Sequence, residues 1–217
     1  MAWTTPETFT AGQTLTAASM NIVSGNLRMG GPVFTNEAAR DAAITAPEEG
    51  MTAYLTAPTV PAATGSTTMV PTGITTIYNG TAWVCVTPIG GYQVNDGTTT
   101  SASFTASLSG TPGTNPSVTL TTGTTALVSI RCGYMQCSLG SGNLAFMGFA
   151  VSGATTLAAS DERTIGVVNN VTNIGVGASL IVTGLTSGTN TFTLNYRSSG
   201  GATGSWQRRE IIVQGIA

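Results

Sequence analysis

The chain has 217 residues and a formal net charge of −2, and charged residues make up only 7% of it, against roughly 25% in an average soluble domain. The low charge and high apolar content argue against disorder, and the absence of a basic stripe argues against a nucleic-acid partner. About 40 threonines, with many valines and isoleucines, favour strands over helices. We therefore expect a mainly β protein. The sequence has no run of about 18 apolar residues, so no membrane-spanning segment is predicted.

Residues 1–34 are predicted to form an extended arm with one short helix. The hydroxyl of Thr16 can cap a helix over Ala17–Leu27, because it accepts a free backbone amide. An isolated helix of this length is marginal in water, so the arm needs a surface to lie on. The expected docking residues are the apolar side chains of the arm, Trp3, Phe9, Leu15, Met20, Val23 and Leu27.

Residues 35–90 are predicted to form a small connector module. Asn36 is placed to cap a helix over Glu37–Ala43. Asn79 and Gly80, flanked by two apolar runs, are a strong signal for a β-hairpin. The hairpin strands are expected at Ile74–Tyr78 and Thr81–Val86, after a first strand at Met51–Thr56 and a loop over 57–73. Residues 91–100, rich in glycine and threonine, are expected to be a hinge.

Residues 101–217 are predicted to form an antiparallel β-sandwich of jelly-roll or tumour-necrosis-factor-like shape, because apolar runs recur with turn signals between them. The expected strands are Ala102–Leu108, Ser117–Thr121, Thr125–Cys137, Leu144–Ser152, Thr164–Val168, Ala178–Thr183, Thr189–Arg197 and Arg208–Gln214.

The run Leu144–Val151 is apolar or glycine at every position, so both faces of this central strand lack polar groups. One face can pack on the domain's own core, and the other needs a second subunit. We therefore expect a homotrimer. The predicted interface residues are Phe146, Met147, Phe149, Arg197, Arg208 and Arg209. The arginines are expected to grip Asp161 or Glu210 of a neighbouring subunit, with a purely solubilising role as the alternative.

Three regions of the chain resemble known phage proteins. The opening residues, which include Trp3, the turn over 10–13 and the pair Met20 and Asn21, resemble the start of minor tail and tail-fibre proteins of tailed bacteriophages. The series over 39–55 and 77–84 resembles a small module that recurs in such proteins. Segments 152–161 and 182–193 are similar to C-terminal β-domains of phage fibre and decoration proteins, many of them trimeric.

The residues offer little for catalysis or metal binding. With no histidine, the commonest general base is missing and no Ser-His-Asp or Cys-His pair can form. The adjacent carboxylates Asp161 and Glu162 are expected in an exposed turn, and Cys132 and Cys137 lack the further ligands that structural zinc needs. Three cysteines fit reduced thiols in a cytosol. We predict no enzyme activity, no cofactor and no metal.

The resemblance implies a structural protein of a tailed-phage virion, assembled in the host cytoplasm. The arm would dock on other virion proteins, and the sandwich would project outward as a tail-fibre or tail-tip component, placed to contact the host surface and a glycan on it. Two alternatives stay open: a capsid decoration or head-fibre protein, and a glycan-binding module. For the last, the aromatic candidates are Trp206, Tyr134 and Tyr92, whose alternative role is core or interface packing.

Overall fold

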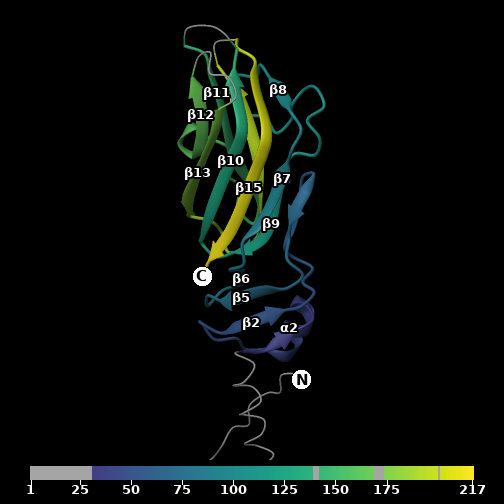
Figure 1. The fold of residues 1–217 in the computed structure, drawn as a ribbon. Coiled ribbons are helices and arrows are strands. Elements are labelled where there is room, and N and C mark those ends of the chain that lie inside the picture. The colour runs from purple at the N-terminus through teal and green to yellow at the C-terminus, as the bar shows by residue number, and fades with distance from the viewer. Residues whose placement is uncertain (1–30, 139–141, 169–173, 200) are drawn as a thin grey trace, which may run out of the picture.

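The computed structural model describes residues 31–138, 142–168, 174–199 and 201–217. The described chain is mainly β, as predicted, with three sheets and one seven-residue α-helix. A small module with one sheet lies below a sandwich of the other two sheets (Figure 1). Within the described ranges, no helix is long and apolar enough to cross a membrane. The predicted helix over Ala17–Leu27, and the docking residues of the arm, lie outside the described residues.

The small module combines helix α2 with a four-stranded sheet in the order β1-β2-β5-β6. The Oδ1 atom of Asn36 accepts a hydrogen bond of 3.0 Å from the amide of Ala39, which confirms the predicted helix cap. The guanidinium of Arg40 is buried and lies 4.7 Å from the centre of the Trp83 ring, which ties the helix to the sheet. The elements of the module are β1 (Val33–Phe34), α2 (Glu37–Ala43), β2 (Thr52–Leu55), β5 (Ile74–Tyr78) and β6 (Trp83–Cys85).

The predicted hairpin at Asn79 and Gly80 is confirmed. The Oδ1 atom of Asn79 accepts hydrogen bonds from the amides of Thr81 and Ala82, at 3.1 and 2.9 Å, and so closes the turn between β5 and β6. Gly80 has a φ of 84°, a backbone conformation that residues other than glycine rarely adopt.

The sandwich consists of a six-stranded and a five-stranded sheet, which confirms the predicted architecture at the level of a β-sandwich. The six-stranded sheet has the order β13-β10-β15-β7-β4, with β8 also paired to β15. Its strands are β4 (Thr67–Met69), β7 (Ile89–Gln93), β8 (Gly97–Thr99), β10 (Thr125–Cys137), β13 (Ile174–Thr183) and β15 (Gly204–Ile216). The five-stranded sheet has the order β12-β11-β14-β9-β3. Its strands are β3 (Ala62–Thr64), β9 (Ser117–Thr122), β11 (Leu144–Gly153), β12 (Thr164–Val168) and β14 (Gly188–Ser198).

The hydrophobic core lies between the two sheets. Along β14 every second side chain is buried, because alternate residues of a strand face opposite sides of its sheet. The same alternation holds in β10, where the inward side chains Val128, Ile130 and Cys132 are at most 1% exposed. The two inner faces therefore meet as in other face-to-face sandwiches.

Two segments that the sequence suggested would be loop or hinge carry strands of the sandwich instead. Strands β3 and β4 fall within the expected loop 57–73, and β8 with the end of β7 falls within the expected hinge 91–100. In β7 the two glycines allow a close approach, since a Cβ on Gly91 would lie 2.3 Å from the carbonyl oxygen of Thr64. Residues 91–100 are therefore part of the six-stranded sheet.

The strand predicted at Ala102–Leu108 is not formed. The segment makes only isolated bridges, with Thr105 paired to Tyr196 of β14. The backbone amide of Thr105 donates to the carbonyl of Tyr196 at 2.9 Å, and the carbonyl of Thr105 accepts from the amide of Tyr196 at 2.8 Å. The segment runs along the edge of β14 beyond Ser117, where β9 begins.

Candidate interaction surfaces

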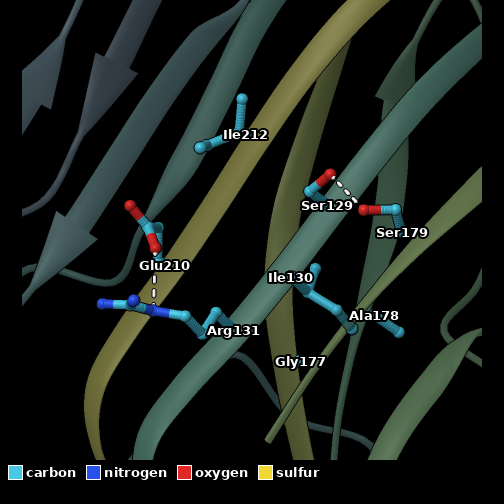
Figure 2. Close-up of a pocket in the computed structure, with 8 residues that line it drawn as sticks. All are labelled: Ser129, Ile130, Arg131, Gly177, Ala178, Ser179, Glu210 and Ile212. Carbon is cyan, nitrogen blue, oxygen red and sulfur yellow. Dashed lines mark hydrogen bonds and ion pairs between the residues drawn. The ribbon is translucent and has the colours of Figure 1, made fainter.

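The outer surface of the six-stranded sheet carries a shallow hollow over β13, β10 and β15, with a volume of about 390 Å³ (Figure 2). We call it the six-stranded face. Its lining residues are Ser129, Ile130, Arg131, Gly177, Ala178, Ser179, Glu210 and Ile212. The hollow exists because Arg131 is paired across the sheet with Gly177, which has no side chain to fill the space.

Two polar pairs cross this face. The hydroxyls of Ser129 and Ser179 are 2.7 Å apart, and the Nε atom of Arg131 lies 3.1 Å from a carboxylate oxygen of Glu210 (Figure 2). Both pairs join neighbouring strands, so they fix the shape of the face. The side chain of Arg131 is 61% exposed, and such an exposed ion pair stabilises the fold little.

Large apolar side chains are exposed along the edges that flank this face. Ile181 on β13 is 67% exposed, Val168 at the end of β12 is 59% exposed, and Ile174 at the start of β13 is 43% exposed. β12 and β13 each form one edge of their respective sheets. An edge strand with exposed apolar side chains is a favourable site for contact with another chain.

These exposed residues were not predicted from the sequence, although the sequence carries a signal for Ile181. The stretches Leu180–Val182 and Ile211–Val213 are apolar at every position, so each carries an apolar side chain on both faces of its strand. The run Leu144–Val151 shows the same pattern over a longer stretch. Ile181 and Ile212 are the outward members of the two stretches.

The predicted interface residues of β11 point to opposite faces, as their spacing requires. Met147 and Phe149 are fully buried between the sheets, and Phe149 packs against Phe192 with ring centres 6.1 Å apart. They are therefore core residues of this chain and not available at its surface. Phe146 lies on the outer face, where it is half-buried beneath the guanidinium of Arg197 at 4.2 Å.

Arg197 is paired within its own chain. Its Nε and Nη2 atoms donate to the two carboxylate oxygens of Asp161 at 2.8 and 2.6 Å, a bidentate pair. The guanidinium also lies 5.4 Å from the ring of Phe104, so it sits between two aromatic rings. The grip on Asp161 of a neighbouring subunit, expected from the sequence, is thus replaced by an internal contact.

The other two predicted arginines differ sharply from each other. Arg208 is exposed and lies over the ring of Tyr134, 4.6 Å from its centre. Arg209 is 1% exposed and donates to the hydroxyl of Tyr196 and to the backbone carbonyls of Asn95 and Pro112. Arg209 is therefore an internal tie between β15 and the segments before β9. Glu210, the other expected acceptor, is paired with Arg131 of its own chain.

The aromatic residues considered for glycan binding do not gather into one platform. Trp206 is fully buried and packs against Tyr196, with ring centres 5.3 Å apart. Tyr134 is covered by Arg208, and Tyr92 lies half-buried on β7. A sugar ring cannot stack on a side chain that has no exposed face, so Trp206 is excluded from this role.

The cysteines and the aspartates considered as reactive groups are buried or held by hydrogen bonds. All three cysteines are free and buried, and burial raises the pKa of Cys85 to about 11 and that of Cys132 to about 12. A reactive thiol needs the opposite shift. Asp96 accepts a hydrogen bond of 2.6 Å from Ser205, and Asp161 is held by Arg197. Among the described residues, no group of three metal-ligating side chains is close enough to hold a metal ion.

No family model and no curated protein matches this chain. Among solved structures, one match is the isomalto-dextranase of Arthrobacter globiformis T6 in complex with panose, at 18% identity and a TM-score of 0.26. The match covers 48% of this chain and 17% of that protein. At this TM-score it supports no statement about activity or ligand.

Proposed function

We propose that the chain is a structural, non-enzymatic component of a tailed-phage virion, most simply a tail-fibre or tail-tip protein. In this proposal the N-terminal arm docks on other virion proteins, and the sandwich is displayed as a homotrimer. The resemblance of the arm and module to phage tail proteins motivates the proposal.

The observation that carries it is the order of parts along the molecule. The module that follows the arm lies at one end of the sandwich, and the C-terminal end of β15 lies beside it (Figure 1). A Cβ on Gly215 would lie 2.6 Å from a methyl carbon of Val84, so the two parts are in close contact there. The C-terminal ends of β10 and β14 lie at the opposite end of the sandwich (Figure 1). Such an order suits a protein that is attached at one end and displayed at the other.

The strand order supports a jelly roll, the finer form of the predicted fold. Strands β7 and β9–β15 form two sheets in the orders β13-β10-β15-β7 and β12-β11-β14-β9. From β9 to β15, consecutive strands change sheet at every step except from β11 to β12. Eight strands in two sheets with such crossings match the description of a jelly roll.

The six-stranded face and its apolar edge support self-association. The hollow and the exposed Ile181 lie on the outer surface of the six-stranded sheet, whereas Val168 lies at the end of β12, an edge strand of the other sheet. In the proposed assembly, the six-stranded face of one copy meets the edge with Val168 of the next, so the contact joins unlike surfaces. A contact between unlike surfaces closes into a ring when the rotation between copies allows it, and a three-fold rotation gives the proposed trimer.

Sedimentation equilibrium of the purified full chain tests the assembly part of the proposal. We expect a trimer at micromolar concentration, because a monomer would leave the apolar edge in water. A stable monomer at that concentration would overturn the trimer. A separate measurement, the number of copies per particle, distinguishes the two virion locations. A few trimers per particle indicate the tail, and tens to hundreds indicate the capsid.

A further inference from the structure

A second hollow, with a volume of about 620 Å³, lies on the outer surface of the five-stranded sheet. We call it the five-stranded cleft. Its floor includes Ala150 of β11 and Asn195 of β14, and its walls are the segments Ala102–Phe104 and Ala158–Asp161. Alanine and serine predominate among the lining residues, and their small side chains leave the space open.

Backbone hydrogen bonds fix both walls of the cleft to the sheet. The wall with Phe104 is held by the two bonds between Thr105 and Tyr196, at 2.9 and 2.8 Å. The opposite wall follows the two bonds between Val151 and Leu157, at 2.8 and 2.9 Å. It ends in the short 3₁₀ helix Asp161–Arg163. A site whose walls are held in this way binds a ligand without first having to order them.

The polar groups of the cleft are oriented in advance. Each carboxylate oxygen of Asp161 accepts one hydrogen bond from Arg197, and each keeps a further lone pair for a ligand. The side chain of Asp161 is 60% exposed and that of Arg197 is 16% exposed. The rings of Phe146 and Phe104 hold the guanidinium in place.

One polar atom in the wall of the cleft has no hydrogen-bond partner among the described residues. It is the hydroxyl of Ser160, which is buried. Buried polar atoms in proteins nearly always have a partner, either in the protein or in a bound molecule. Because Ser160 belongs to the wall of the cleft, a bound ligand is the partner that we expect for this hydroxyl.

We propose that the five-stranded cleft binds a neutral saccharide. Its volume lies within the range of small-ligand sites, about 300–1,000 Å³. Because Asp161 and Arg197 neutralise each other, the cleft offers no net charge to attract an ion. It offers acceptors, donors and an aromatic ring side by side. Sugar hydroxyls both donate and accept hydrogen bonds, and the apolar face of a sugar ring suits the half-buried ring of Phe104.

The proposal does not depend on a virion location and is tested on the purified full chain. Saturation-transfer NMR with glucose, galactose, mannose and N-acetylglucosamine as separate probes should show transfer to at least one of them. For that probe, calorimetry should show binding about tenfold weaker or more in Asp161→Asn, which loses the charge-assisted contacts. Phe104→Leu should weaken binding as well, because it keeps the bulk of the side chain but not the flat ring.

The matched control is Glu210→Gln, which removes the carboxylate that pairs with Arg131 on the opposite sheet and should leave sugar binding unchanged. Calcium chloride and sodium acetate serve as ionic probes. Absence of binding by all four sugars would overturn the proposal. It would also be overturned by equal weakening in Glu210→Gln, or by binding of calcium or acetate without any sugar. Equal melting temperatures of the variants would exclude unfolding as the cause of a loss.

Discussion

At the scale of single residues, Phe146 and Phe149 illustrate how one strand serves two surroundings. They are three residues apart on β11, so they face opposite sides of the sheet. Phe149 has no exposed surface, whereas Phe146 is half-buried under Arg197. The period of a strand predicts the opposition, but it does not reveal which side faces the core.

Truncation of the two rings should therefore differ in cost. Phe149→Ala leaves a cavity between the sheets and should lower the free energy of unfolding by about 3–5 kcal/mol. Phe146→Ala loses a half-buried ring and its contact with Arg197, and should cost about 1–2 kcal/mol. Urea denaturation of both variants measures the difference. Equal costs would mean that β11 does not have one inner and one outer face.

The buried thiols predict a loss of stability at alkaline pH. The pKa of Cys85 is raised to about 11 and that of Cys132 to about 12 by burial, from an ordinary value of 9.0. Above pH 9 the unfolded chain releases these protons before the folded chain does. The stabilisation is therefore complete below about pH 9 and is lost as the pH rises towards about 12. Burial also raises the pKa of Tyr196, which adds to the trend.

Urea denaturation across this pH range measures the effect. Cys132→Ala is the matched variant, because it removes one of the shifted groups with a small change in volume. Its unfolding free energy should fall less steeply with pH than that of the parent. A parent whose stability stays flat from about pH 9 to 12 would contradict the burial of these groups.

At the scale of elements, strands with alternating patterns could be predicted well and strands made by tertiary contact could not. The predicted bounds of β5, β10, β12 and α2 agree with the structure residue for residue. The prediction of a hinge over 91–100 was wrong, because glycines such as those of β7 are locally typical of turns. In the folded chain, Gly91 instead allows the backbone of Thr64 to approach. Such contacts between distant segments leave no local pattern.

The exposed edge of β13 gives a prediction for this scale. Ile181→Arg places a charge where we expect a second copy to pack, and should weaken trimer formation at least tenfold while leaving the melting temperature of the monomer unchanged. Val94→Arg is the control, because Val94 is also an exposed apolar residue, at 43%, but lies in the turn after β7. Sedimentation velocity compares the two. Equal association of Ile181→Arg and the parent would exclude this edge from the interface.

The candidate site was predictable only in part. Arg197 and Asp161 were selected from the sequence, yet as partners between subunits rather than within one chain. The two positions are far apart in the sequence, and no local pattern indicates that the segment with Asp161 packs beside Arg197 of β14. Phe104 was not selected, because the sequence placed it in a strand over Ala102–Leu108 that the folded chain does not form.

At the scale of the whole molecule, the arm and the module need a revised boundary. The predicted arm ended at residue 34, but β1 (Val33–Phe34) pairs in parallel with β2, and Phe34 is only 9% exposed. Deletion of residues 1–30 should keep the melting temperature of the parent, whereas deletion of residues 1–34 should lower it, because the second deletion removes a strand of the module. Circular dichroism melting of both truncated proteins checks this. Equal melting temperatures would show that β1 contributes nothing to the module.

The most direct test of the proposed function is to locate the protein on particles. Antibodies raised against the sandwich and labelled with gold can be added to purified phage particles from cells that carry the coding sequence, and viewed by electron microscopy. We expect gold at the tails of particles assembled with the full chain. Particles assembled with a chain that lacks residues 1–30 should carry no gold. Intact particles without any gold, with all of the protein left in the soluble fraction of the lysate, would contradict a virion role.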